Sequence, residues 1–306
     1  MQLRLFDLDG SLDAQHSLRD VAAWSAVTQV ALRDLAPGLR LWSRAATIDA
    51  ARARLASAPV SSDAAITLIG SGDYHHLAVL LIEQVREPVT VVHFDNHPDW
   101  VRWAPRWHCG SWVNQVLRIK QVAKVVTIGP TSEDLTRPQL KGANLSALAA
   151  GRIALFPWQH APSRVWGTFP SGAGHRYENG YLFWRNLHSG SAAENSRLIL
   201  EQIGTEAVWF SIDKDVLAES EALTNWDQGQ MPLAAICELI AAIGAHKRIV
   251  GADICGEYSE PEMANLFKRI ESRFDRPQRL PDSEALERNE TVNRTLLATI
   301  ARAAAA

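Results

Sequence analysis

The sequence predicts an α/β fold of three layers, in which helices cover both faces of a mostly parallel central sheet. Short apolar runs rich in β-branched residues recur along the chain, and most are followed by a Gly, Asp or Asn turn and a helical stretch. That alternation is typical of parallel strands joined by helices. The runs are also apolar at consecutive positions, as expected of strands buried on both faces.

The individual elements follow from the same pattern in chain order. Apolar β-branched runs predict strands at residues 3–6, 66–69, 89–94, 122–128, 153–156, 207–212 and 248–252. Helical spacing predicts helices at residues 75–84, 231–242 and 262–272. Residues 158–190 are rich in Gly, Pro, His and aromatic residues without a clear period, so we expect a long functional or packing loop. Pro277 and Pro281 precede a last helix at residues 282–303, and no repeat or linker divides the single domain expected at residues 1–306.

The composition is that of an ordinary globular protein. The chain carries 31 Lys and Arg against 34 Asp and Glu, a formal charge of −3, which gives no electrostatic reason to expect nucleic acid or a membrane as partner. A small-molecule substrate is the simpler expectation. Neither a secretory signal nor an apolar run of about 18 residues is visible, so we expect a cytoplasmic protein. Cys109, Cys237 and Cys255 form no CxxC pair, which favours reduced thiols over disulfides or zinc-thiolate ligation.

Three potential metal ligands follow the strand expected at residues 89–94. Asp95, His97 and Asp99 stand at alternate positions, and alternate side chains of an extended chain point the same way. Pro98 cannot continue a hydrogen-bond ladder and turns the chain. Because open parallel sheets bind ligands at the carboxyl ends of their strands, these side chains can converge at that edge.

A second acidic pair, Asp213 and Asp215, follows the strand expected at residues 207–212, with Lys214 directed to the other side. If the two strand ends meet, four carboxylates share one cleft and repel or stay protonated unless a cation compensates them. Oxygen-rich ligation with few imidazoles favours a hard or borderline ion, so Mn²⁺ is the first choice, with Zn²⁺, Fe²⁺ or Mg²⁺ as alternatives. Bridging carboxylates could hold two ions and generate hydroxide at neutral pH.

A third motif, GSGDYHH at residues 70–76, lies between an expected strand and an expected helix. Its glycines permit close backbone approach, and one of the two histidines, His75 or His76, could complete the metal shell.

The ordered set GSGDYHH, DNHPD, HCGS, SIDKD and DICGE resembles the motifs of the arginase, agmatinase and formiminoglutamase (ureohydrolase) family. That family carries GGDHS, DAHxD, a downstream His-Gly, SxDxD and a late DxxE in the same order, and the match spans roughly residues 66–260. The resemblance implies an arginase-like fold, a centre of two Mn²⁺ ions, and hydrolysis of a guanidinium, formimino or amide C–N bond by metal-bound hydroxide. It also implies a possible homo-oligomer, because the family commonly forms trimers or hexamers.

The resemblance further implies roles for individual residues. The metal ligands would be Asp95, His97, Asp99, Asp213 and Asp215, with Asp95 and Asp213 as bridges and Asp215 also serving catalysis. The remaining ligand is the His of GGDHS, which an extra residue here leaves to His75 or His76. Aligning His75-His76-Leu77 with His-Ser-Leu favours His75.

Residues around the metal ligands match the family less closely. His108 resembles the family's proton-shuttling His and could protonate a leaving amine. Asp253 and Glu257 resemble the acidic pair that contacts the guanidinium group, although Gly256 stands where the Glu is expected. The stretch after SIDKD also departs from the family pattern. The Trp-rich segment at residues 100–112 could wall the pocket or pack in the core.

Three other functions remain open. FDLDGS at residues 6–11 resembles the nucleophile motif of haloacid dehalogenase-type phosphatases, in which Asp7 would attack phosphorus and Asp9 would be the acid. A deacetylase-like amide hydrolase would use His75 and His76 as acid and base beside a single metal. The third is a metal-binding protein that has kept its ligands without hydrolase activity.

Overall fold

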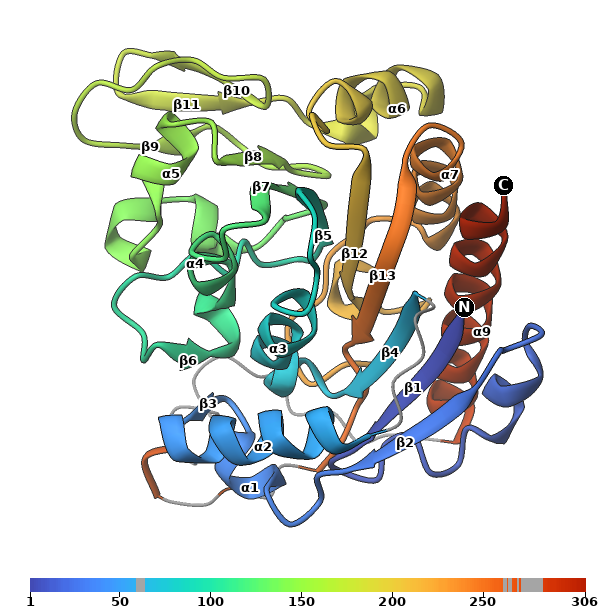
Figure 1. The fold of residues 1–306 in the computed structure, drawn as a ribbon. Helices are drawn as coiled ribbons and strands as arrows, with labels where there is room; N and C mark the ends of the chain where they lie inside the picture. The colour runs from blue at the N-terminus through green and yellow to red at the C-terminus, as the bar shows by residue number, and fades with distance from the viewer. Residues whose placement is uncertain (59–63, 261–262, 264–265, 269, 271–282) are drawn as a thin grey trace.

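The computed structural model describes residues 1–58, 64–260, 263, 266–268, 270 and 283–306. Its centre is an eight-stranded sheet in the order β2-β1-β4-β13-β12-β5-β7-β8, and all neighbouring strands run parallel (Figure 1). All the predicted strands are present. The sheet consists of β1 (Gln2–Asp7), β2 (Val27–Ala31), β4 (Ala65–Gly70), β5 (Val89–Phe94), β7 (Val122–Ile128), β8 (Ile153–Phe156), β12 (Ala207–Asp213) and β13 (Arg248–Cys255).

Helices cover both faces of the sheet, which confirms the three-layer prediction. Helices α2 (Ala45–Ser57), α3 (Ala78–Ile82), α4 (Trp112–Val116) and α5 (Leu145–Ala149) share one buried apolar cluster. On the other face, α6 (Ala192–Leu200), α7 (Leu233–Gly244) and α9 (Ser283–Ala305) share a second cluster. Ile48 and Trp112 belong to the first cluster, Ile240 and Ile300 to the second, so each sheet face has its own core.

Short elements complete the described chain. They are α1 (Ala36–Leu39) and the 3-10 helices η1 (His16–Asp20), η2 (Gly72–Leu77), η3 (Cys109–Ser111), η4 (Glu133–Leu135), η5 (Pro138–Lys141), η6 (Leu187–Ser189) and η7 (Lys214–Val216). A small antiparallel pair joins β3 (Trp42–Ser43) to β6 (Trp107–His108). No helix in the described ranges is both long and apolar enough to cross a membrane.

The predicted helices are present where the structure describes them, with shifted limits. The helix predicted at residues 75–84 begins earlier, as η2, and continues as α3. The helix predicted at residues 231–242 is α7, which starts after Pro232. The last helix is α9, close to the predicted range. Most of residues 262–272, together with Pro277 and Pro281, lie outside the described residues.

The expectation of a loop at residues 158–190 was wrong. This stretch contains a three-stranded antiparallel sheet of β9 (Ser163–Arg164), β10 (His175–Glu178) and β11 (Tyr181–Trp184), drawn at the top left of Figure 1. Asn179 and Gly180, with φ of 49° and 82°, connect β10 to β11. An Asn-Gly pair is a typical signal of such a two-residue hairpin turn, so the sequence did contain the information.

Candidate metal centre

The two acidic strand ends are neighbours in the sheet. Strands β5 and β12 pair directly, with Phe94 opposite Ile212, so the residues that follow them emerge at the same carboxyl edge. η2, which follows β4, adds a histidine there. Together these segments contribute the residues that we call the His–Asp cluster: His75, Asp95, His97, Asp99, Asp213 and Asp215. All of them except His97 are buried.

His75 lies at the centre of the first half of the cluster. Its Nδ1 is 3.3 Å from Asp95 Oδ2, 3.4 Å from Asp99 Oδ2 and 3.6 Å from Asp213 Oδ2. This buried nitrogen has no hydrogen-bond partner among the described residues. A buried polar atom without a partner is costly, and a cation between these four atoms would satisfy them all.

A hydrogen-bond chain behind His75 determines which nitrogen faces the carboxylates. Ser211 Oγ donates to Asp253 Oδ1 at 2.8 Å and lies 2.9 Å from His75 Nε2. Because a serine hydroxyl has a single hydrogen, His75 Nε2 donates to Ser211, and in the neutral ring the lone pair lies on Nδ1. A hydrogen bond of this kind orients the imidazole ligands of metals. Ser211 was not predicted, although its place two residues before Asp213 puts it on the same side of β12.

The second half of the cluster consists of His97, Asp215 and the Oδ1 oxygen of Asp95. His97 Nδ1 is 2.9 Å from Asp215 Oδ2 and 3.5 Å from Asp95 Oδ1. His97 Nε2 lies 3.0 Å from Asp227 Oδ1, which can accept a hydrogen bond from it, and in the neutral ring the Nδ1 lone pair then faces the cluster. Asp95 thus presents Oδ2 to His75 and Oδ1 to His97, the arrangement of a bridging carboxylate.

Two glycines give Asp213 room to reach the cluster. A Cβ on Gly72 would lie 2.5 Å from Asp213 Oδ2, and a Cβ on Gly256 would lie 2.4 Å from Asp213 Oδ1. Gly256 also has a φ of +88°, which residues with side chains rarely adopt. The family's Glu therefore cannot stand at position 256 without displacing Asp213, which explains this departure from the DxxE pattern.

Crowding of the carboxylates changes their proton affinity. Burial, followed by the charge of Asp95, raises the pKa of Asp99 to about 6 and also raises the pKa of Asp213. Burial and the charges of Asp213 and Asp95 raise the pKa of Asp215 well above its usual value. Burial acts on Asp95 in the same direction, but neighbouring imidazoles outweigh it and hold the pKa of Asp95 well below its usual value. The cluster therefore retains protons that a divalent cation would displace.

The donor types and their spacing fit divalent metal ions. Donor atoms that bind one ion at about 2.1 Å lie about 3.0–3.4 Å from one another in octahedral or tetrahedral geometry. In the cluster, each imidazole Nδ1 lies between 2.9 and 3.6 Å from its carboxylate oxygens. Carboxylates and imidazoles are ligands of Mn²⁺, Zn²⁺ and Fe²⁺ alike.

Cys255 supports the cluster without supplying a thiolate. Its Sγ donates to Asp213 Oδ2 at 3.2 Å. Burial, followed by the charge of Asp213, raises the pKa of this thiol well above its usual value, so it stays protonated. Cys109, Cys237 and Cys255 are all free, as predicted.

Two aromatic side chains hold the carboxylates that follow β5. Trp112 Nε1 donates to Asp99 Oδ2 at 2.6 Å, and His93 Nε2 lies 2.8 Å from Asp95 Oδ2. Neither residue was predicted. His93 precedes Asp95 by two residues, so the alternation of the strand could have revealed it. Trp112 belongs to α4, and sequence spacing gives no signal for its contact with Asp99.

His76 lies outside the cluster, which corrects the prediction that it could be a ligand. Its Nε2 is 2.9 Å from Ser43 Oγ of β3. Burial lowers the pKa of His76 well below its usual value, so the ring is neutral. Of the two adjacent histidines, only His75 faces the carboxylates.

The structure also corrects the predicted contacts of Asp253 and Glu257 with a substrate. Asp253 accepts from Trp209 Nε1 at 2.6 Å, in addition to its bond behind His75. Glu257 is buried, forms an ion pair with Lys214, and accepts from Asn289 Nδ2 at 3.0 Å. Because groups of neighbouring elements satisfy both carboxylates, Glu257 is not placed as the catalytic or substrate-binding acid that we expected.

A pocket of about 230 Å³ opens onto the cluster. Its wall includes His108, the residue proposed as a proton shuttle, and the Nδ1 of this half-buried ring accepts from Gly110 N at 2.9 Å. The proton of the neutral His108 ring therefore lies on Nε2. The Trp in the wall is Trp226 rather than one of the Trp-rich segment. The described lining comprises Gly72, Asp95, His97, Asp99, Val101, His108, Cys109, Gly110, Asp134, Lys141, Asp213, Asp215 and Trp226.

The acids of the N-terminal FDLDGS motif are engaged in ion pairs. Asp7 Oδ1 lies 2.6 Å from Arg33 Nη2, and Asp9 Oδ2 lies 3.4 Å from the buried Arg40 Nη2. Asp9 Oδ2 also accepts from Ser71 N at 3.3 Å, so it holds the turn after β4. These contacts assign the two acids a structural role.

Comparisons with known proteins agree with this architecture. The chain matches no family model. An uncharacterised protein of Thermotoga maritima is 27% identical over 231 residues, which are 72% of this chain and 73% of the relative. Among solved structures, the arginase of Entamoeba histolytica with L-ornithine has a TM-score of 0.62 at 11% identity, covering 98% of this chain and 97% of its own.

Two further solved structures are similar over nearly the whole chain. The formimidoylglutamase of Bacillus subtilis has a TM-score of 0.59 at 13% identity, covering 98% of this chain and 86% of its own. The proclavaminate amidino hydrolase of Streptomyces clavuligerus has a TM-score of 0.57 at 15% identity, covering 99% and 92%. This chain therefore has the fold of the arginase, agmatinase and formiminoglutamase (ureohydrolase) structures.

Proposed function

We propose that this chain is a metal-dependent hydrolase, a divergent ureohydrolase of one domain that cleaves a C–N bond of a small molecule with two divalent ions. The observation that carries the proposal is the double use of Asp95. One of its oxygens faces the partnerless His75 Nδ1, and the other faces His97 Nδ1. Two adjacent groups of donors that share a carboxylate are suited to two ions.

The cluster divides into two sets of ligands. His75, Asp95, Asp99 and Asp213 would hold one ion, and Asp95, His97, Asp213 and Asp215 would hold the other. Mn²⁺ is the first choice, with Zn²⁺ or Fe²⁺ as alternatives. When bound, the ions would supply a water of lowered pKa and polarise the bond under attack. Ser211 and Asp227 would orient the two imidazoles from behind.

His108 would move the proton that the leaving nitrogen requires. The Gly110 N–H bond to Nδ1 keeps the proton of the neutral ring on Nε2, where it can be donated. The ring is half-buried in the pocket wall, so it can recover a proton from solvent. These properties are those of a general acid that cycles once per turnover.

The wall of the pocket offers few acids to a cationic group, whether a guanidinium or a protonated formimino group. Beyond the cluster, Asp134 is the one acid in the described wall, and its Oδ1 lies 3.7 Å from Lys141 Nζ. Glu257 is held away by Lys214. A cationic substrate group would thus find no acid in the described wall outside the cluster that is not already paired, which favours a neutral amide.

Metal content and turnover of the protein purified without chelator test the proposal. We expect about two equivalents of divalent metal per chain, and hydrolysis of some member of a panel of formimino, acyl-amino and guanidino compounds by the Mn²⁺-loaded protein. Asp213→Ala should lose both metal and activity. Asp7→Ala is the matched control, because Asp7 pairs only with Arg33 among the described residues and should keep both.

Two outcomes would contradict the proposal. Metal content near one equivalent would favour the deacetylase-like hydrolase, although His76 does not lie beside His75 at the cluster as that mechanism requires. Two bound ions without turnover of any compound would favour a metal-binding protein that lacks hydrolase activity.

A further inference from the structure

A second and larger pocket lies between α4 and α5, apart from the His–Asp cluster. It has a volume of about 590 Å³, which is within the range of about 300–1,000 Å³ typical of small-molecule sites. It shares one lining residue, Val101, with the pocket over the cluster. We call it the arginine pocket. Its described lining comprises Val101, Arg102, Ala104, Arg106, Ser111, Asn114, Gln115, Leu117, Arg118, Asn144, Ser146, Ala147 and Arg152.

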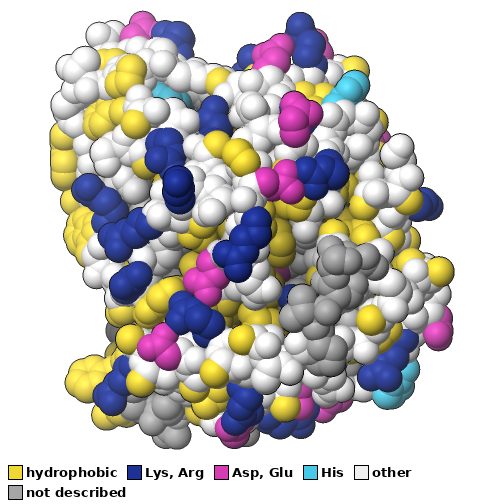
Figure 2. Space-filling model, in the orientation of Figure 1, with side chains coloured by type: hydrophobic (Ala, Val, Ile, Leu, Met, Phe, Trp, Pro, Cys, Tyr) yellow, Lys and Arg dark blue, Asp and Glu magenta, His cyan; other side chains and the backbone are white. Residues whose placement is uncertain are grey.

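The charge of the arginine pocket has one sign. Four arginines, Arg102, Arg106, Arg118 and Arg152, line it, and its described lining contains no Asp or Glu. The whole chain has a formal charge of −3, so this concentration of positive charge is local rather than a property of the entire surface. Figure 2 shows Lys and Arg side chains gathered on the left half of this face, the half that carries α4 and α5 in Figure 1.

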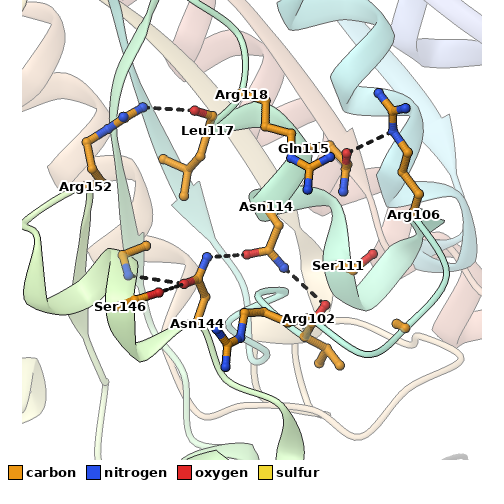
Figure 3. Close-up of a pocket in the computed structure, with 13 residues that line it drawn as sticks. Arg102, Arg106, Ser111, Asn114, Gln115, Leu117, Arg118, Asn144, Ser146 and Arg152 are labelled. Atoms are coloured by element: carbon orange, nitrogen blue, oxygen red, sulfur yellow. Dashed lines mark hydrogen bonds between the residues drawn. The ribbon is translucent and has the colours of Figure 1, made fainter.

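Two of the arginines are held in place by the protein. Arg152 donates through Nε and Nη2 to the carbonyl oxygens of Ala123, Leu117 and Val122, at 3.0–3.1 Å. Arg106 Nε donates to Gln115 Oε1 at 3.2 Å. Figure 3 shows these two arginines on opposite sides of the pocket.

The other two arginines keep their donors available. Within the described part of the chain, the guanidinium groups of Arg102 and Arg118 have neither a hydrogen bond nor an ion pair. The backbone of Arg102 is nevertheless fixed, because its N donates to the Gly142 carbonyl at 2.9 Å. Each guanidinium offers five N–H donors, and its fork geometry matches carboxylate and phosphate oxygens.

A hydrogen-bonded amide pair fixes the interior between these arginines. Asn144 Nδ2 donates to Asn114 Oδ1 at 2.7 Å, and Asn114 Nδ2 donates to the Val101 carbonyl at 3.1 Å. Asn144 Oδ1 also accepts from Ser146 Oγ at 2.8 Å and caps α5. Figure 3 shows this pair amid the arginines. Side-chain hydrogen bonds thus order the polar floor of the pocket between the arginines.

We propose that the arginine pocket binds a small molecule with two or more negative charges, such as a phosphate ester or a dicarboxylate. Two fixed arginines and two with unused donors can contact several anionic oxygens at once, and the like charges of the arginines make an anion the favoured occupant. The pocket is concave and of small-molecule size, which favours a compact polyanion over a nucleic acid strand. This site goes beyond the proposed hydrolysis and does not depend on it.

The test is a calorimetric titration of the metal-loaded protein at low salt. Ethanedisulfonate is the first probe, because its two sulfonate groups give it two negative charges and sulfonates are poor metal ligands. Inorganic phosphate and succinate then distinguish phosphate from carboxylate preference. We expect saturable binding that weakens as NaCl is raised, because exposed charges are screened by salt. The double variant Arg102→Gln/Arg118→Gln should weaken binding at least about tenfold, since two charged contacts are lost.

Matched controls make the result decisive. Arg54→Gln also removes an exposed arginine, but one that pairs with Asp34 outside the pocket, so its binding should equal that of the original chain. Because the guanidinium groups of Arg102 and Arg118 have no hydrogen-bond or ion-pair partner among the described residues, the double variant should keep its melting temperature. The proposal is overturned if no probe binds saturably, or if binding persists unchanged in the double variant, which would place the anion at the His–Asp cluster instead.

Discussion

Gly72→Ala should damage the proposed metal centre with a single added methyl group. The new Cβ would lie 2.5 Å from Asp213 Oδ2, and an ordinary contact begins near 3.4 Å, so about 0.9 Å of movement is required. Metal–ligand distances tolerate only about 0.2 Å. If the backbone moved instead of the carboxylate, the overpacking would cost about 1–3 kcal/mol. Gly72 does not have a positive φ, so the effect of alanine is steric rather than conformational.

We expect the affinity for metal to fall by about 100-fold or more, equivalent to about 2.7 kcal/mol, because a proposed bridging ligand is displaced. Competition with a fluorescent chelator measures this affinity, and circular dichroism checks that the fold is retained. Gly204→Ala is the matched control, since its Cβ would meet nothing within 4 Å. Unchanged metal affinity in a well-folded Gly72→Ala protein would refute the steric reasoning.

Three further predictions concern the groups around the cluster. In metal-free protein, Asp99 has its pKa raised to about 6, and the pKa values of Asp213 and Asp215 are also raised by burial and like charges. A carboxyl group whose pKa is higher in the folded than in the unfolded chain stabilises the fold below about pH 4, and this stabilisation is lost as the pH rises through about 6. For Asp99 alone, the free energy of unfolding should fall by on the order of 3 kcal/mol. Chelated protein should therefore melt at a lower temperature at pH 8 than at pH 5, and added Mn²⁺ should abolish the difference; a higher melting temperature at pH 8 would contradict this. His75→Ala should lose most bound metal by elemental analysis, whereas His76→Ala should keep it, and equal losses would show that our choice between them is wrong. Glu257→Gln should lower the free energy of unfolding by about 3 kcal/mol, because Lys214 stays buried without its charge partner. Its metal content should be unchanged, and loss of metal in this variant would show that Glu257 contributes to the metal centre.

Local patterns predicted the cluster residues that lie at the end of a single strand. Asp95, His97 and Asp99 follow from the alternation of an extended chain, and Asp213 with Asp215 from the same rule at a second strand. That the two strands are adjacent is a property of topology, which the sequence alone does not reveal. The pairing of β5 with β12 was therefore an assumption until the structure gave it.

The predictions failed where a contact joins distant segments or where a turn signal was overlooked. Asp227 lies 130 residues after His97 in the sequence, and Glu257 lies 43 residues after Lys214. Because both contacts join distant segments, no local sequence pattern predicts either pair. The edge strand β2 was missed because Val30 is its only buried residue, so no apolar run marks it. The hairpin at Asn179 and Gly180 is different, since its turn signal was present in the sequence.

The His–Asp cluster lies at the ends of central strands, whereas other residues of the pocket wall lie outside the sheet. Strands β4, β13, β12 and β5 are consecutive neighbours, so backbone hydrogen bonds at a spacing of about 4.8 Å determine how far apart the ligand-bearing segments stand. His108, Lys141 and Trp226, in contrast, lie in segments outside the central sheet, and these segments can change without altering that spacing. If the His–Asp cluster binds metal as proposed, changes in these segments would alter the substrate while the ligand positions stay the same.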